Sequence, residues 1–211
     1  MPMNIAVLGA NGRTGSLFVE EALMAGHTVR AGIHGDVNPF ADAPRLEVVH
    51  CDAAKKAQLK KLLKGQDAVI SLLGHTRSSG KTVQTDTMKA LVEVMKELRI
   101  KRLISLTGTG VRFPGDQITL TDRLLNTGIS IIDPSRVKDG RSHALVLQES
   151  KLEWTIVRVL KLTNGDPKPN RLSENGPTKS AVARREVAQA ILQILEDNSF
   201  RHKAPIIAPR D

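Results

Sequence analysis

The feature that most constrains this chain is a short apolar segment that runs directly into three evenly spaced glycines. Residues 4–8 (NIAVL) precede Gly9, Gly12 and Gly15, and helix-forming residues follow the last glycine. In such a unit the first glycine permits a sharp turn, the second lets the backbone approach a diphosphate, and the third lets the helix pack close to the strand. The N–H groups and the dipole at the helix start then favour an anion. The pattern predicts a dinucleotide site, with an incidental turn as the alternative.

The chain contains no tyrosine. Short-chain dehydrogenases usually protonate or deprotonate the substrate oxygen with a Tyr-x-x-x-Lys pair, and that arrangement is impossible here. Any redox chemistry must therefore take its proton from another group or from solvent. The sequence also lacks a Gly-x-Ser-x-Gly elbow and a Walker lysine motif, which excludes two other common kinds of catalytic or phosphate-binding site.

The composition is that of one α/β domain with an aliphatic core. The 211 residues include 40% hydrophobic but only 2% aromatic side chains, which suits a single domain over residues 1–211. The sequence has no apolar run of membrane-spanning length and no signal-peptide pattern, so we expect a cytoplasmic location without membrane contact. The single Cys51 fits a reducing compartment. It is expected to be a buried filler, with a reactive thiol as the alternative.

The net charge of +9 favours an anionic partner, such as a phosphate-bearing cofactor or an acidic substrate. Nucleic acid is disfavoured because one Trp and four Phe offer few stacking platforms. Much of the excess charge lies in residues 55–64, which predict a helix with a solvated lysine face and with Leu59, Leu62 and Leu63 turned inward. We expect no metal site, because the six His and one Cys show no close ligand spacing.

Strand and helix signals alternate, which predicts an α/β fold with a doubly wound, mostly parallel sheet of the Rossmann type. Strands are expected at residues 4–8, 28–33, 46–50, 67–72, 102–106, 154–159 and 205–208. Helices are expected at residues 14–25, 55–64, 82–98, 119–126, 139–150 and 184–196. The apolar residues 129–132 could be a helix end or a strand. Residues 160–182, rich in Asn, Gly, Pro and Lys, are expected to form a small, loop-rich C-terminal lobe that covers substrate.

Several of these segments, in this order and spacing, resemble one family. They are residues 9–15, 27–31, 51–53, 65–74, 103–108, 150–158 and 185–188. Together they resemble atypical short-chain dehydrogenases/reductases of the NAD(P)H-binding, NmrA-like group, most of all its flavin reductase and biliverdin-IX-beta reductase type. One departure is Val159, which follows Arg158 where the family commonly has Arg-Pro. The family's substrate specificity therefore does not carry over.

The resemblance implies which residues bind the cofactor. It places the diphosphate and the nearby ribose on Gly9, Asn11, Gly12, Arg13, Thr14 and Gly15. It places the adenine against Asp52 and Ala53, and the nicotinamide and its ribose near Leu73 and Gly74. Thr107 stands where the family usually has a serine, and would orient the nicotinamide. The plainer interpretation of Thr107 is a strand-end residue that bonds locally.

The choice between NADP and NAD depends on the end of the second expected strand. An NAD-selective site places a carboxylate there, on the ribose 2′-hydroxyl. This chain has Ile33 and His34 instead, and family members that prefer NADP often have Arg where His34 stands. Arg13 could pair with a 2′-phosphate, whereas Asp36 is the counter-indication. NADP is therefore favoured, with NAD as the alternative.

A flavin or a quinone accepts hydride without a strong protein acid nearby, which suits a chain without tyrosine. The candidate catalytic residues are Thr107, His75 and His143, the histidines as acids near neutral pH. Arg77 and Arg112 are candidates for contact with substrate. A structural histidine and a solvated loop charge are the plainer interpretations of these residues.

Four further charged residues surround Pro134 and Gly140, and they could form a structural ion-pair network or a substrate mouth. They are Asp133, Arg136, Asp139 and Arg141. The structural interpretation is favoured.

Three functions stay open on the sequence alone. The favoured one is an NAD(P)H-dependent reductase of a small conjugated acceptor such as a flavin or quinone. The alternative is a cofactor-binding sensor or regulator of the NmrA-like type that does not turn over. The third is a nucleic-acid-associated protein on the same fold. The sequence indicates no oligomeric state.

Overall fold

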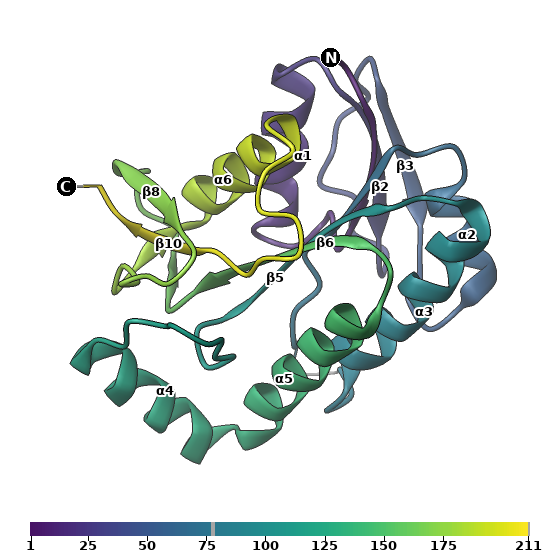
Figure 1. The fold of residues 1–211 in the computed structure, drawn as a ribbon. Coiled ribbons are helices and arrows are strands. Elements are labelled where there is room, and N and C mark those ends of the chain that lie inside the picture. Colours follow the sequence, from purple (N-terminus) through teal and green to yellow (C-terminus); the bar gives the residue numbers. More distant parts are fainter. Residues whose placement is uncertain (77–78, 211) are drawn as a thin grey trace.

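Strands and helices alternate along the chain in the computed structural model, which describes residues 1–76 and 79–210 (Figure 1). The strands are β1 Asn4–Leu8, β2 Thr28–Ile33, β3 Leu46–His50, β4 Ala68–Ser71, β5 Arg102–Gly108, β6 Glu153–Val159, β7 Leu162–Thr163, β8 Asn170–Ser173, β9 Val182–Ala183 and β10 Ile206–Pro209. The helices are α1 Gly15–Met24, α2 Lys56–Leu63, α3 Val83–Leu98, α4 Leu120–Ile132, α5 Pro134–Glu149 and α6 Arg184–Glu196.

The main sheet has the strand order β3-β2-β1-β4-β5-β6-β10-β8. Its strands pair in parallel except for β8 against β10. This confirms the predicted doubly wound, mostly parallel sheet. The order reverses at β1, where Leu8 pairs with Gly32 on one side and with Ser71 on the other. In open α/β sheets a ligand crevice opens at such a reversal, outside the carboxyl ends of the strands.

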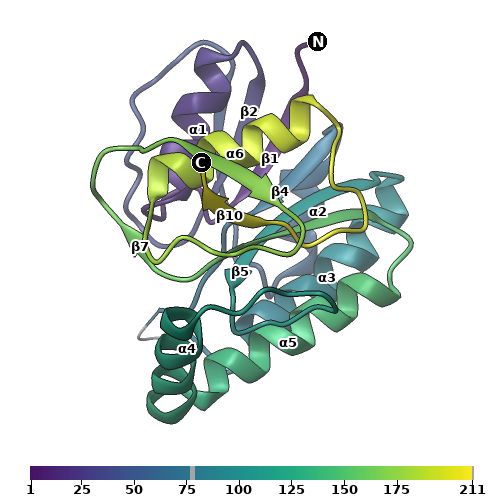
Figure 2. The same cartoon turned by 60° about the vertical axis from the view of Figure 1, so that its left-hand side comes forward.

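Helices cover both faces of the sheet (Figures 1 and 2). α1 and α6 pack together on one face, while α2, α3 and α5 cover the other. Aliphatic side chains fill both interfaces. Leu59, Leu62 and Leu63 of α2 are fully buried, which confirms the predicted inward face. α2 can lie close to the sheet because Gly32 has no side chain: a Cβ there would lie 2.7 Å from Leu62 Cδ2.

The region predicted as a loop-rich lobe contains short strands. β7 pairs in parallel with β9, and β8 pairs antiparallel with β10 at the edge of the main sheet. These strands are too short to show an alternation of apolar and polar residues. Each is defined by hydrogen bonds to a strand that is distant in the sequence. Glu186 near the start of α6 ties this lobe to the body, because its carboxylate accepts hydrogen bonds from Lys179 Nζ at 2.6 Å and Asn170 Nδ2 at 3.2 Å.

α4 and α5 differ in extent from the prediction. The apolar residues 129–132 form the end of α4, not a strand. α5 begins at Pro134 and not at residue 139, because Asp133 caps it: its carboxylate accepts a hydrogen bond from Arg136 N at 3.2 Å, and Pro134 occupies the first helical position. The cap at Asp133 thus starts α5 earlier than its apolar pattern indicates.

α4 lies at the periphery of the molecule (Figures 1 and 2). Asp122 is its one buried residue in the described chain. Large apolar side chains therefore face solvent along this helix: Leu120, Leu124, Leu125, Ile129, Ile131 and Ile132. As far as the structure describes the chain, none of its helices has the length and apolarity needed to cross a membrane.

Arg158 in β6 is fully buried and joins several segments. Its guanidinium pairs with Asp116 through two hydrogen bonds of 2.5 and 2.8 Å and lies 4.8 Å from the centre of the Phe113 ring. It also donates to the carbonyl oxygens of Val111, Glu174 and Ala204. Arg158 therefore anchors the turn after β5, the lobe and the approach to β10 to the sheet.

Candidate cofactor-binding cleft

The turn between β1 and α1 depends on two of its glycines. Gly9 adopts a φ of +77°, in the left-handed region that favours glycine. Its carbonyl accepts a hydrogen bond from Gly12 N at 3.1 Å, which tightens the turn. Gly15 is enclosed, because a Cβ there would lie 2.1 Å from Gly9 O. The sequence pattern therefore produces the close approach of strand, turn and helix that it predicts.

The start of α1 is open to an anion. Thr14 at the N-cap contributes no side-chain hydrogen bond, and the first turn carries no acidic residue. The first amides of a helix have no intrahelical acceptor and carry the positive end of the helix dipole. Arg13, exposed beside them, adds a full positive charge. This combination is suited to a diphosphate.

A cleft of about 490 Å³ opens at the carboxyl ends of the central strands, in the size range of small-molecule and cofactor sites. The glycine turn lines one end with Gly12, Arg13 and Thr14. The floor is formed by residues 72–76 after β4, Gln84, residues 106–108 of β5, Gly110 and Val111. The remaining walls come from Asn126, Ile129, Arg136, Val137, Val159, Leu160, Leu162 and Arg184.

The charge of this cleft is one-sided. Arg13, His75, Arg136 and Arg184 line it, and no Asp or Glu does so among the residues that the structure describes. A concave surface with one sign of charge concentrates ligands of the opposite sign. The cleft is therefore suited to a ligand that carries phosphate.

Thr107 lies on the floor of the cleft near the end of β5. It is 7% exposed, and α5 approaches it closely at Gly140, where a Cβ would lie 3.0 Å from Thr107 Oγ1. Gln84 of α3 reaches the same floor, and its Nε2 donates a hydrogen bond to Leu73 O at 3.2 Å. The hydroxyl of Thr107 and the amide of Gln84 thus line the part of the cleft where the resemblance places the nicotinamide.

His75 lines the cleft beside a buried carboxylate. Its Nε2 lies 2.9 Å from Asp139 Oδ2, the distance of an ion pair without the alignment of a hydrogen bond. Asp139 belongs to α5 but accepts hydrogen bonds from the backbone amides of Gln84 and Thr85, each at 2.9 Å. The dipole at the start of α3 stabilises a carboxylate in this position. Asp139, the neighbour of His75, is therefore held in place between α5 and the start of α3.

His143 lies beneath the floor and not in the cleft. Its side chain is 1% exposed, its Nε2 lies 3.0 Å from Ser105 Oγ, and its Nδ1 has no partner among the described residues. Ser105 and His143 line a separate small cavity of about 10 Å³. Burial lowers the pKa of His143 to about 4, against the opposing effect of Asp139. His143 is therefore neutral at neutral pH.

Other predicted cofactor residues lie on the same edge of the sheet, outside the lining of the cleft. The side chain of Asn11 donates hydrogen bonds to the carbonyls of His34 at 2.9 Å and Val37 at 3.2 Å. Asn11 thus pins the loop after β2 to the glycine turn. Asp52 follows β3, and its carboxylate accepts a hydrogen bond from the amide two residues later, at 3.0 Å. Asp52 and Ala53 therefore stay predicted contacts of the adenine.

Arg112, one of the two predicted substrate contacts, lies outside the cleft lining. It pairs with the buried carboxylate of Asp122 in α4, which fixes α4 to the turn after β5. Arg77 lies outside the described residues. Neither residue therefore adds a structural argument about the substrate.

The charged residues around Pro134 and Gly140 do not form one network. Asp133 pairs with Arg136 at 3.3 Å, Asp139 bonds to the start of α3, and Arg141 is exposed. Arg136 also lines the cleft. Asp133 and Asp139 therefore make structural bonds, whereas Arg136 contributes to the cleft wall.

Thr76 of the cleft was not predicted, and neither were three polar residues on helices: Gln84, Asn126 and Arg184. They come from three helices far apart in the sequence, and none lies in a motif that marks a ligand site. Arg184 opens a helix directly after the lobe, and only the packing of α6 on α1 brings it to the glycine turn. In the described ranges 1–76 and 79–210, His, Cys, Asp and Glu side chains form no group that could hold a metal ion.

Comparison with known proteins finds relatives over nearly the whole chain. The profile of the NAD(P)H-binding family matches residues 9–198. A short-chain dehydrogenase/reductase from Veillonella parvula in complex with NADP is 21% identical, with a TM-score of 0.80 over 99% of this chain and 95% of that one. A proposed NADH-flavin reductase from Streptococcus pneumoniae is 20% identical, with a TM-score of 0.79 over 99% of this chain and 100% of that one. These structures share the fold.

Proposed function

The chain belongs to the NAD(P)H-binding family of atypical short-chain dehydrogenases/reductases, and from that membership we propose that it is an NADPH-dependent reductase of a small conjugated acceptor such as a flavin or quinone. The observation that carries the proposal is the two-ended cleft. The glycine turn lines one end, and apolar side chains from α4, α5 and the segment after β6 line the other. A dinucleotide with its diphosphate on the turn would direct its nicotinamide toward Thr107.

The apolar end suits a planar acceptor. Ile129, Val137, Leu160 and Leu162 line it, and such side chains pack against a conjugated ring without demanding hydrogen bonds from it. A flavin or a quinone can take hydride without a strong acid beside it. This class of acceptor therefore fits a cleft in a chain without tyrosine. The proposed NADH-flavin reductase of Streptococcus pneumoniae has the same fold.

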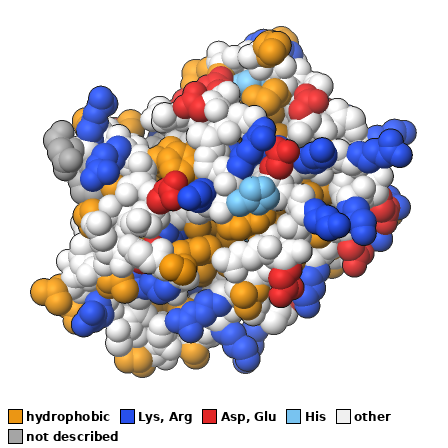
Figure 3. All heavy atoms as spheres, viewed as in Figure 1, with side chains coloured by type: hydrophobic (Ala, Val, Ile, Leu, Met, Phe, Trp, Pro, Cys, Tyr) orange, Lys and Arg blue, Asp and Glu red, His pale blue; other side chains and the backbone are white. Residues whose placement is uncertain are grey.

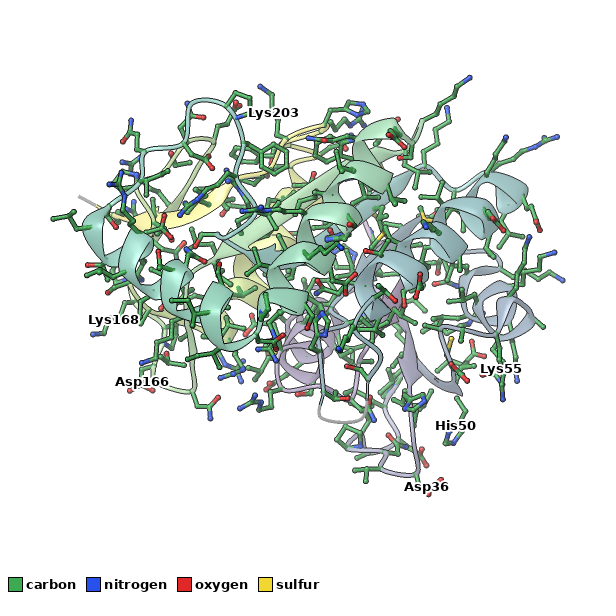
Figure 4. All side chains as sticks on the ribbon, turned by 90° about the horizontal axis from the view of Figure 1, so that it is seen from below. Asp36, His50, Lys55, Asp166, Lys168 and Lys203 are labelled. Atoms are coloured by element: carbon green, nitrogen blue, oxygen red, sulfur yellow. The ribbon has the colours of Figure 1, made fainter. Side chains whose placement is uncertain are left out.

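The preference for NADPH rests on the end of β2. Ile33 ends this strand and His34 follows, so no carboxylate stands where an NAD-selective site would need one. Asp36 is exposed at the outer end of the following loop (Figure 4). The Veillonella parvula relative was crystallised with NADP. We therefore propose NADPH as the better cofactor, with NADH as a weaker substitute.

The chain's own contribution to the chemistry is positioning and proton supply. When bound, the reduced nicotinamide supplies hydride. Thr107 and Gln84 are placed to hydrogen-bond the carboxamide or the acceptor on the cleft floor. Of the two candidate histidines, His75 lines the cleft whereas His143 does not. His75, held beside Asp139, is therefore the proposed proton donor.

Two remaining expectations belong to the same proposal. A cytoplasmic location fits a chain with one unpaired thiol, Cys51, because both NADPH and reduced thiols occur there. On the face shown in Figure 3, Lys and Arg side chains are scattered among acidic ones and do not gather in one stripe. That distribution gives no support to nucleic acid as the partner.

The test is NADPH oxidation by the purified protein with flavin mononucleotide, dichlorophenolindophenol and simple quinones as acceptors. We expect turnover with at least one of them, and a higher kcat/KM with NADPH than with NADH. Tight cofactor binding without turnover over the whole panel would contradict the reductase proposal.

That outcome would favour a second candidate, a cofactor-binding regulator. The observation behind it is α4, whose apolar side chains face solvent over the length of the helix. Exposed apolar surface of this extent is typical of a binding site for another protein. A regulator would use the cleft to sense the cofactor and the surface of α4 to report on it.

A further inference from the structure

Arg184 is a buried guanidinium without a counter-charge. It opens α6 and lines the cleft, yet it is only 8% exposed. Its hydrogen bond is to a neutral group, Asn164 Oδ1, at 2.5 Å. Arg184 forms no ion pair with any described residue. Because a buried charge is costly unless it is paired, this arrangement is incomplete without an anion.

A second arginine, Arg13, lines the same cleft as Arg184. It lies in the glycine turn and forms no ion pair within the described ranges. Burial and then the positive charge of Arg13 lower the pKa of Arg184, because the two positive charges that line the cleft repel each other. No described acid lines the cleft to relieve that repulsion.

The fold holds the two arginines together. α1 and α6 pack against each other, and Arg185 of α6 pairs with Glu20 at 2.8 Å and Glu21 at 2.6 Å in α1. The start of α6 is therefore fixed against the middle of α1. Arg13, Arg184 and Thr14 at the N-cap of α1 line the same cleft.

We propose that Arg13 and Arg184 form a clamp for the diphosphate of the bound dinucleotide, Arg13 from the glycine turn and Arg184 from the start of α6. The clamp deepens the proposed function and rests on it. Guanidinium groups bind phosphate oxygens with two parallel charge-assisted hydrogen bonds, which makes arginine the side chain suited to this position. Arg184 donates a hydrogen bond to Asn164 of the lobe, so the lobe holds this side chain at the cleft.

The clamp assigns Arg13 a different partner from the 2′-phosphate that the sequence suggests, and the two assignments differ in outcome. A diphosphate is common to NADH and NADPH, whereas a 2′-phosphate is present only in NADPH. Loss of a clamp residue must therefore weaken both cofactors by the same factor. Loss of a residue that binds the 2′-phosphate weakens NADPH selectively.

The experiment measures the Kd of NADPH and NADH by fluorescence titration for the wild type, Arg184→Gln and Arg13→Gln. We expect both variants to bind each cofactor roughly tenfold or more weakly, with the ratio of the two Kd values unchanged. Lys168→Gln is the matched control, because it removes one positive charge from the outer end of the lobe (Figure 4). It should leave both Kd values within about twofold.

A second measurement separates the clamp from a structural role. Without ligand, Arg184→Gln should unfold at the same temperature as the wild type or a higher one, because it removes the repulsion. Inorganic pyrophosphate should raise the unfolding temperature of the wild type and not that of either variant. A variant that keeps wild-type affinity, or loses only NADPH affinity, overturns the clamp. If the wild type binds neither cofactor, the proposed function itself fails.

Discussion

Ser105 Oγ in β5 lies 3.0 Å from His143 Nε2 in α5, and both side chains are buried. The pair connects the sheet to the helix that also carries Asp139. Because burial withdraws the imidazole from bulk water and so disfavours its charged form, it lowers the pKa of His143 to about 4. The pair is therefore a neutral hydrogen bond that supports the cleft floor from below.

This pair predicts how stability depends on pH. The unfolded chain takes up the proton near pH 6.5, whereas the folded protein resists it until about pH 4. The free energy of unfolding should therefore be highest above pH 6.5 and fall by about 1.4 kcal/mol per unit as the pH drops toward 4. Urea unfolding over this range measures the slope. In His143→Gln, which can still bond to Ser105, the slope should be smaller by that amount; equal slopes would refute the prediction.

Substitution of His75 should lower the turnover rate without changing the affinity for NADPH. If it donates the proton, His75→Gln should lower kcat by roughly a hundredfold while the Kd of NADPH stays the same. Steady-state rates with the best acceptor and a fluorescence titration measure the two quantities. His50→Gln is the control, since His50 is exposed at the end of β3 (Figure 4). An unchanged kcat in the His75 variant would mean that the proton comes from solvent.

Of the three glycines in the turn, Gly15 should tolerate a side chain least. A Cβ at this position would lie 2.1 Å from Gly9 O and 2.9 Å from Ala10 Cα, so Gly15→Ala must displace the turn. We expect a loss of about 1–3 kcal/mol of stability and no measurable cofactor binding at concentrations that saturate the wild type. Gly165→Ala, with open space around its Cβ, should change neither quantity. Normal cofactor affinity in Gly15→Ala would contradict the proposed diphosphate site.

Arg158 predicts a large structural effect. Arg158→Leu leaves the Asp116 carboxylate, whose side chain is 4% exposed, without its counter-charge, and should cost about 3–5 kcal/mol of stability. Adding Asp116→Asn should restore part of the loss, because the stranded charge is then removed. Urea unfolding of the single and double variants measures this. The exposed pair of Arg201 and Glu153, at 3.4 Å, is the control, and Arg201→Ala should cost less than about 1 kcal/mol.

Cys51 predicts an inert thiol. Burial, followed by the charge of Asp52, raises its pKa to about 11, and the thiolate is the reactive form. Iodoacetamide at mildly alkaline pH should leave the folded protein unmodified and should label it stoichiometrically in urea. Mass spectrometry of the intact chain measures both. Rapid labelling of the folded protein would support the alternative of a reactive cysteine.

The sequence predicts those strands and helices that are determined by the residues within them. β1, β2, β3 and α6 have the bounds that their apolar periods indicate, and the glycine turn follows from its own spacing. α5 starts earlier than its apolar pattern because a cap, Asp133, and Pro134 determine its first turn. β7, β8 and β9 escape prediction because each is defined by a partner strand distant in sequence.

The same distinction applies to the cleft. Gly12, Leu73 and Thr107, which the sequence predicts as cofactor contacts, line the cleft, because each lies near the carboxyl end of a strand and these ends form the binding edge. Arg184 carries no such signal, since its neighbours in sequence predict only a helix start. Its position depends on how α6 packs on α1, a contact between segments that are distant in the sequence.

The last strand has a consequence for how the protein is made. β10 lies between β6 and β8, so the lobe residues Asn170–Ser173 cannot join the sheet until residues 206–209 are available. During synthesis the sheet up to β6 can form while the lobe waits, unpaired, for its partner to leave the ribosome. Pairing of β8 with the sheet is therefore a late event of folding, because it needs the strand that follows α6.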